Sequence, residues 1–191
     1  MPNYPIVLAS QSPRRRELMA LVVPAFEIEV AAVDESAFSW EENPAQVAAQ
    51  LAGVKAQAVF ARRPQAIVIG CDTVVELDGQ VLGKPKTKDE AVAMLTALAA
   101  RRHKVHTGVA VYAPQQAPFT FFETTTVEFS AVAPEDILAC ADTDEPYDKA
   151  GAYGIQGWAA RFVTRIEGCY YNVMGLPVAA LYRSLKQHKL I

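Results

Sequence analysis

The sequence predicts an α/β fold in which helices flank a mixed β-sheet. In the first half of the chain, β-type stretches alternate with stretches of helical periodicity, whereas β-type stretches cluster in the second half. With 191 residues, of which 51% are apolar, the chain is long enough for one α/β domain, or a lobed domain with a cleft, around a sizeable core.

Apolar runs and capping residues predict the first three elements. Residues 5–9 form a short apolar run typical of a buried strand. Residues 12–22 are expected to be a helix, because Ser12 is a favoured N-cap and Pro13 a favoured first helical residue. Residues 25–31 alternate apolar and polar side chains, as a strand does.

A long helix, a hairpin and a capped helix are expected next. Residues 44–62 place apolar side chains at helical spacing, and Gly53 weakens this helix without having to break it. Residues 66–77 are rich in Val and Ile and precede Asp-Gly at 78–79, a strong hairpin turn. The capping box TKDE at 87–90 then begins another helix.

The second half of the chain predicts paired strands, a short helix with acids in its first turn, a glycine-rich loop, a second strand pair and a final helix. The paired strands are expected at 104–113 and 119–131, and the short helix at 134–141. The glycine-rich loop is expected at 144–157, the second strand pair near 158–171, and the final helix from 177 onward.

Charge and hydropathy argue against several classes of partner. The net charge of −3 gives no basic surface for nucleic acid. No apolar stretch reaches the ~18 residues that a membrane span needs, and the first basic residues follow an apolar run instead of preceding it, unlike in a signal peptide. The cysteines are far apart without a CxxC pair, which favours a reducing compartment and no zinc site: Cys71, Cys140 and Cys169.

Consecutive arginines at 14–16 occupy the first turn of the first predicted helix, where the helix dipole favours acids. A bound anion would compensate, because free N–H groups and guanidinium groups both bind phosphate oxygens, and Ser10 and Ser12 add hydroxyls. The alternative is a solvated basic turn with Arg16 paired to an acid. The preceding buried strand favours the anion, since ligands in α/β sheets gather where strands end and helices begin.

Asp72 interrupts a run of Val and Ile, where an acid is costly unless it is paired or bound to a metal. The alternative is an edge position facing water, but the central place of Asp72 in the run favours a function. Asp34 and Glu35 follow a predicted strand and are either a solvated loop pair or, with Asp72, ligands of a divalent ion. Mg²⁺ typically takes one or two carboxylates, waters and substrate phosphates.

Three weaker signals gain significance only if they lie near the arginines. Lys84 stands in a turn between Gly and Pro, and Lys55 lies on an alanine-rich helix, although such lysines are usually just solvated. Residues 148–157 contain three glycines, which allow close approach to a ligand, and Gln156, whose amide could bind a base edge. A plain glycine-rich connection is the alternative, and no P-loop is present.

Together these stretches resemble the Maf family of nucleoside triphosphate pyrophosphatases. The matching segments follow one another over nearly the whole chain: LASQSPRR at 8–15, DE at 34–35, Lys55 in LAGVKA, GCDTVV at 70–75, GKP at 83–85, HKVHTGVAV at 103–111, DKAGAYGIQG at 148–157 and NVMGLP at 172–177. The combination is highly specific, although no single segment would be.

The resemblance implies an elongated mixed α/β fold with a central cleft, similar to inosine triphosphate pyrophosphatases. Residues 1–191 would then form a single domain with two lobes around the cleft, working as a cytoplasmic homodimer. The implied reaction cleaves a nucleoside triphosphate between its α- and β-phosphates into a monophosphate and pyrophosphate, and it needs a divalent metal such as Mg²⁺ or Mn²⁺.

Particular residues take roles by the same resemblance. We assign the phosphates to Ser10, Arg14, Arg15, Lys55 and Lys84, and catalysis and the metal to Asp72 and Glu35. The base would face Thr73 and Gln156. Arg14, Thr73 and Gln156 match the branch that acts on dTTP and UTP, whereas the branch associated with 7-methylguanosine triphosphate has Trp, Gln and Glu at these positions.

Two alternatives stand beside this assignment. The substrates would be modified nucleotides if the chain is a house-cleaning enzyme. The chain would instead be a nucleotide-binding regulator of cell division, with incidental hydrolysis, if the family's link to septum formation reflects its main role. The presence of both Asp72 and Glu35 favours an enzyme, because a pure sensor would tolerate their loss.

Overall fold

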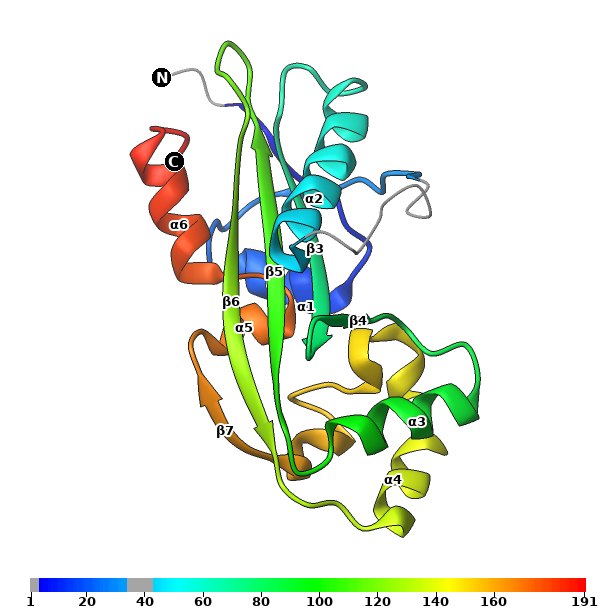
Figure 1. Cartoon of the computed structure of the whole chain (residues 1–191). Helices are drawn as coiled ribbons and strands as arrows, with labels where there is room; N and C mark the ends of the chain where they lie inside the picture. The colour runs from blue at the N-terminus through cyan, green and yellow to red at the C-terminus, as the bar shows by residue number, and fades with distance from the viewer. Residues whose placement is uncertain (1–3, 34–42) are drawn as a thin grey trace.

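The computed structural model describes residues 4–33 and 43–191. Within these residues, seven strands form one sheet in the order β2-β1-β3-β5-β6-β7, with β4 beside β3 (Figure 1). The strands are β1 (Ile6–Leu8), β2 (Glu27–Ile28), β3 (Ile67–Leu77), β4 (Gln80–Leu82), β5 (Arg102–Tyr112), β6 (Phe119–Phe129) and β7 (Val163–Glu167). β1 runs parallel to β2 and β3, and the other pairs are antiparallel, so the sheet is mixed as predicted.

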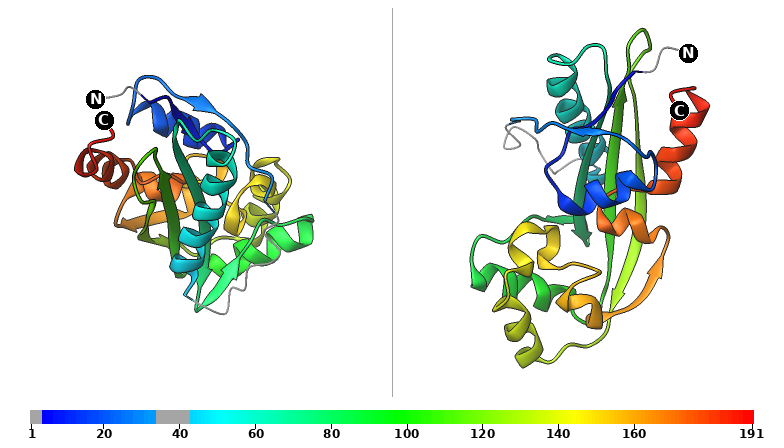
Figure 2. Two further views of the ribbon diagram at one scale, coloured as in Figure 1. Left: turned by 90° about the horizontal axis from the view of Figure 1, so that it is seen from above. Right: turned by 180° about the vertical axis from the view of Figure 1, so that it is seen from behind.

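Helices cover both faces of the sheet (Figure 2). One face carries α2 (Pro44–Phe60), and the other carries α1 (Pro13–Ala20), α5 (Tyr170–Met174) and α6 (Val178–Gln187). At the far end of the long strands β5 and β6 lie α3 (Lys88–Leu98) and α4 (Pro134–Ala141), with the 3₁₀ turns η2 (Glu145–Asp148), η3 (Ala150–Ala152) and η4 (Trp158–Phe162).

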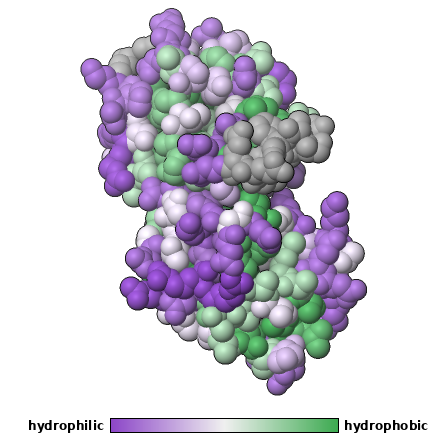
Figure 3. Space-filling view, in the orientation of Figure 1, coloured by the Kyte–Doolittle hydropathy of each residue, from purple (hydrophilic) through white to green (hydrophobic). Residues whose placement is uncertain are grey.

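Separate apolar clusters give the molecule its elongated shape. One cluster packs β1, β3 and β5 against α1, α5 and α6, and includes Leu8, Met19, Ile69 and Leu181. A second joins α3, α4 and the 3₁₀ turns to the other end of the strands. The space-filling view narrows between these two parts (Figure 3). No helix in the described part of the chain is long and apolar enough to cross a membrane.

Two glycines let α2 lie directly on the sheet. A Cβ at Gly70 would lie 2.3 Å from the carbonyl oxygen of Ala52, and one at Gly108 would lie 2.3 Å from the backbone of Ala48. Because backbone atoms cannot yield as a flexible side-chain end does, both positions require glycine. Gly53 does not interrupt α2, which is continuous over its 17 residues.

The capping residues predict the helix starts correctly. The Ser12 hydroxyl accepts the N–H of Arg15 with Pro13 at the first position of α1, and Thr87 accepts the N–H of Glu90 at the start of α3.

Two strand predictions are wrong in extent. The strand expected over 25–31 is only Glu27–Ile28. The strand pair expected near 158–171 is a single strand, β7, because residues 158–162 form η4 and residues 170–174 form α5.

Candidate functional site

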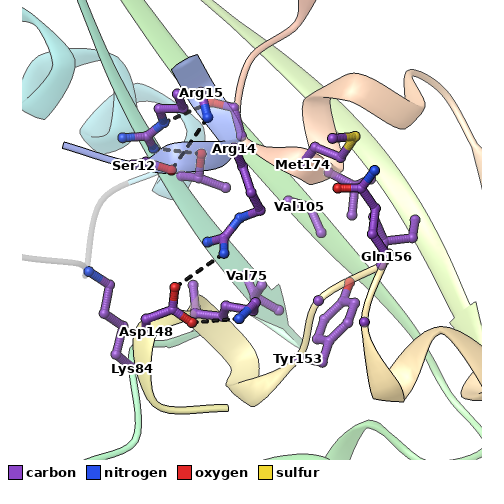
Figure 4. A pocket seen from close by; sticks show the side chains of 18 residues that line it. Ser12, Arg14, Arg15, Val75, Lys84, Val105, Asp148, Tyr153, Gln156 and Met174 are labelled. Atoms are coloured by element: carbon purple, nitrogen blue, oxygen red, sulfur yellow. Dashed lines mark hydrogen bonds and ion pairs between the residues drawn. The ribbon is translucent and has the colours of Figure 1, made fainter. Parts of the chain in front are cut away.

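A pocket opens where the start of α1, the middle of β3, the 3₁₀ segment and the end of α5 meet (Figure 4). Its lining draws on both parts of the molecule. Five of its lining residues are ones to which the resemblance gives a role in binding phosphates or the base: Arg14, Arg15, Thr73, Lys84 and Gln156. Ser10 is buried directly behind them and contacts Arg15. Most of the residues assigned to substrate binding therefore lie together.

Arg14 points across the pocket to an acid from the distant 3₁₀ segment. Its Nη1 lies 3.2 Å from Oδ2 of Asp148, and Nζ of Lys149 lies 2.5 Å from Oδ1 of the same carboxylate. Partial burial works to raise the pKa of Asp148. The hydrogen bond and charge of Lys149, with the charge of Arg14, outweigh it, so this pKa lies below its ordinary value. An anion thus already lies among these cations, and it belongs to the protein.

Arg15 is held from three directions. Its Nε donates to the carbonyl oxygen of Gly175 at 2.9 Å, its Nη2 to Oγ1 of Thr73 at 3.0 Å, and its Nη1 to Oγ of Ser10 at 3.3 Å. Thr73 in turn lies 3.0 Å from the hydroxyl of Thr107, its partner in the β3–β5 ladder. The guanidinium of Arg15 therefore ties α1 to β3 and to the end of α5.

Lys55 and Asp72 form a pair on the other face of the sheet. Nζ of Lys55 lies 2.5 Å from Oδ1 of Asp72, and the two side chains are 14% and 11% exposed. Asp72 and Thr73 are consecutive in β3, so their side chains point to opposite faces. The close packing of α2 on Gly70 and Gly108 brings Lys55 to this acid.

The burial of Asp72 excludes the alternative of an edge position facing water. Asp72 is only 7% exposed, and β3 has β1, β4 and β5 as neighbours. Its charge is balanced by Lys55, as a buried carboxylate requires.

The residues present fit a divalent ion in part. Lys55 bonds Oδ1 of Asp72, and within residues 4–33 and 43–191 no hydrogen bond reaches Oδ2, which leaves a hard oxygen donor suited to Mg²⁺ or Mn²⁺. Glu35, the second expected ligand, lies outside the described residues, as does Asp34. The described residues contain no group of three His, Cys, Asp or Glu side chains that could hold a metal without other ligands.

Gln156 lies on the side of the pocket opposite Asp148 and Lys84 (Figure 4). Apolar side chains from three elements line the same pocket: Val75, Val105 and Met174. Tyr153 also lines the pocket, and its hydroxyl is 2.7 Å from Nε2 of the buried His103. Apolar lining residues beside one amide suit a heterocyclic base.

The model of the family described as Maf-like protein matches residues 5–188. The chain belongs to the Maf family. Its curated relatives include a protein of Carboxydothermus hydrogenoformans, 48% identical over 95% of this chain and 97% of the relative. A protein of Bacillus cereus is 45% identical over 95% of this chain and 94% of that protein. Both relatives bear the name dTTP/UTP pyrophosphatase.

Solved structures agree on the fold of this Maf protein. The Ham1 protein of Staphylococcus aureus matches with a TM-score of 0.54 at 18% identity, covering 96% of this chain and 98% of that one. A Ham1 protein of Coxiella burnetii matches with a TM-score of 0.51 at 15% identity, covering 96% and 99%. These matches confirm the predicted α/β fold class.

Sequence reasoning missed two residues that contact side chains of this pocket. Asp148 stands in the DKAGAYGIQG segment with no role assigned to it, although an acid beside a glycine-rich stretch is an available partner for one of the three arginines. Thr107, which is fully buried, could have been found from strand pairing, because a hydroxyl inside an apolar strand needs a partner. Arg16, by contrast, lines a separate shallow groove beside β2 and is not part of this pocket.

Proposed function

We propose that this chain hydrolyses dTTP and UTP to the monophosphate and pyrophosphate. The observation that carries the proposal is one pocket with a cationic side, apolar lining residues and an amide. A buried acid paired with a lysine lies on the opposite face of β3, whose Thr73 lines the pocket. Relatives named dTTP/UTP pyrophosphatase, similar over nearly their whole length, support the same substrates.

The phosphates would bind at the cationic side. A triphosphate carries about four negative charges near neutral pH, so its cleavage depends mostly on positioning and charge neutralisation. Lys84 and Arg14 face the pocket, and the N–H groups that begin α1 lie beside them. Arg14 would exchange Asp148 for phosphate oxygens, whereas Arg15, held by Ser10 and Gly175, would keep the start of α1 in place.

Asp72 would accept the proton of the attacking water. As the oxygen of that water bonds to the α-phosphorus, the bond from the α-phosphorus to the oxygen that bridges the α- and β-phosphates breaks. Pyrophosphate leaves with that oxygen and the electron pair of the broken bond. Lys55 fixes Oδ1 of Asp72 and adds positive charge. With Glu35, Asp72 would hold Mg²⁺ or Mn²⁺, which supplies further neutralisation of the phosphate charge when bound. Asp72 precedes the pocket-lining Thr73 in β3, and its side chain points to the opposite face of the sheet, where Lys55 lies.

Gln156 and Thr73 would select the base. A pyrimidine edge carries both a donor and an acceptor, and the side-chain amide of Gln156 offers the complementary pair. The oxygen of a glutamate would instead favour the donor-rich edge of guanine. Replacing Gln156 by Glu is therefore expected to shift preference away from dTTP.

The homodimer and the cytoplasmic location that the resemblance implies remain proposals. Sedimentation velocity at micromolar concentration tests the first, with a single species of about twice the 20.8 kDa chain mass expected.

Product analysis over a panel of nucleoside triphosphates, with Mg²⁺ or Mn²⁺, tests the function. dTMP or UMP with pyrophosphate is the expected result, at rates well above those for purine nucleotides. A diphosphate with orthophosphate would contradict the proposed bond, and fastest turnover of a modified nucleotide would favour the house-cleaning alternative.

A further inference from the structure

One carboxylate organises the loop that carries Gln156. Glu145 begins η2, and its side chain reaches back across the glycine-rich segment. Its Oε1 accepts the backbone N–H groups of Gly154 and Ala159, both at 3.2 Å, and its Oε2 accepts that of Trp158. Hydrogen bonds to an ionised acceptor are roughly twice as strong as neutral ones, so three of them on one carboxylate fix this backbone firmly.

Glycine at 157 makes room for that carboxylate. A Cβ at Gly157 would lie 1.9 Å from Oε2 of Glu145. The φ of Gly157 is −99°, which any residue adopts, so this position needs glycine for space and not for its backbone angles. The loop and the acid are therefore built to fit each other.

Gln156 lies between the anchored positions. Gly154 and Trp158 are bonded on either side of it, and the neighbouring Ile155 is buried. Gln156 itself is exposed and lines the pocket, and no hydrogen bond holds its amide among the described residues. The direction in which this amide points thus depends on the backbone that Glu145 holds.

Glu145 does not itself line the pocket. We propose that it is a positioning residue for base selection, whose carboxylate holds the 154–159 backbone so that the amide of Gln156 meets the pyrimidine edge. This inference rests on the proposed function, since it requires Gln156 to contact the base.

The test compares kcat/KM for dTTP and for dGTP in matched variants. Glu145→Gln keeps the size of the side chain but replaces one acceptor oxygen by an NH₂ group that faces N–H donors. We expect kcat/KM for dTTP to fall about tenfold and that for dGTP to fall less than about threefold, because only the first depends on the amide. Asp144→Asn is the control: this neighbouring acid is exposed, makes no capping hydrogen bond, and should leave both values unchanged.

A double-mutant cycle separates positioning from general stability. In the Glu145→Gln background, Gln156→Ala should reduce the preference for dTTP no further, since the amide is already misplaced. Additive losses, or equal losses for both nucleotides, would overturn the inference.

Gly157→Ala serves if Glu145→Gln fails to fold. The three atoms nearest to the new methyl group all belong to the flexible end of the Glu145 side chain, so the methyl group displaces the carboxylate while leaving the acid in the chain. It should lower the preference for dTTP in the same way, and an unchanged preference would contradict the inference. The wild-type chain tests the proposed function separately: that proposal fails if the wild type does not prefer dTTP to dGTP, whatever the variants do.

Discussion

Acidification should destabilise the protein through His103. This side chain is 2% exposed and packs against Phe129 and Tyr153, and its Nδ1 has no hydrogen-bond partner among the residues that the structure describes. Burial lowers its pKa from 6.5 to about 4. Between these two pH values the imidazole of His103 binds a proton in the unfolded chain but not in the folded chain. Stability is therefore lost as pH falls from about 6.5 to about 4.

The magnitude follows from the two pKa values. At about 1.4 kcal/mol per pKa unit, the full loss for His103 is about 3 kcal/mol, of which somewhat more than 2 kcal/mol falls between pH 7.5 and pH 4.5. Burial also lowers the pKa of His106 despite its bond to Glu76, so His106 contributes in the same direction.

Urea unfolding at pH 7.5 and pH 4.5 measures this loss. His103→Gln will be less stable at both pH values, because Tyr153 loses its ring partner, but its loss on acidification should be smaller than that of the wild type by about 2 kcal/mol. His188→Gln is the control, since His188 is only half-buried and lies outside the cluster of Phe129 and Tyr153, and the variant should keep the wild-type loss. An equal acid loss in His103→Gln and the wild type would refute the assignment.

Three further predictions concern the site and the helix that supports it. Asp72→Asn should lower kcat for dTTP by at least about 10²-fold while far-ultraviolet circular dichroism stays unchanged; near-normal turnover would remove Asp72 from the mechanism. Gly108→Ala should cost about 1–3 kcal/mol of unfolding free energy, measured in urea, because its Cβ would lie 2.3 Å from the backbone of Ala48; wild-type stability would contradict the close packing of α2. Lys84→Ala should raise KM for dTTP several-fold and reduce its dependence on salt, whereas an unchanged KM would mean that this lysine faces only solvent.

The sequence predicted elements best where the deciding interactions are local. Ser12, Pro13 and the TKDE box determine the starts of two helices within a few residues of chain, and both starts were correct. The mixed sheet likewise followed from the alternation of β-type and helical stretches early in the chain and the clustering of β-type stretches later.

The failure at 158–162 has a long-range cause. The N–H groups of Trp158 and Ala159 are held by Glu145, 13 and 14 positions earlier in the chain, and this bends the backbone into a 3₁₀ turn. The pattern of apolar residues within a short segment does not reveal a hydrogen bond to a residue 13 or 14 positions away, so the apolar stretch resembled a strand.

The candidate site shows the same difference between what local sequence predicts and what depends on long-range contacts. The residue types of the site were visible in the sequence, but their partners were not. Arg14 bonds Asp148, which is 134 positions away in the sequence. Lys55 reaches Asp72 because Gly70 and Gly108 let α2 pack closely on the sheet. Helix dipole reasoning indicated an anion near the arginines, and it could not indicate that Asp148 would lie there in the free protein.

A crystal structure with a non-hydrolysable dTTP analogue and Mg²⁺ tests the central claim most directly. The triphosphate should lie at the start of α1, in contact with Arg14 and Lys84 and beside Asp72, with Arg14 released from Asp148 and the thymine against Gln156. A triphosphate bound elsewhere, with the guanidinium of Arg14 still on Asp148, would contradict the account.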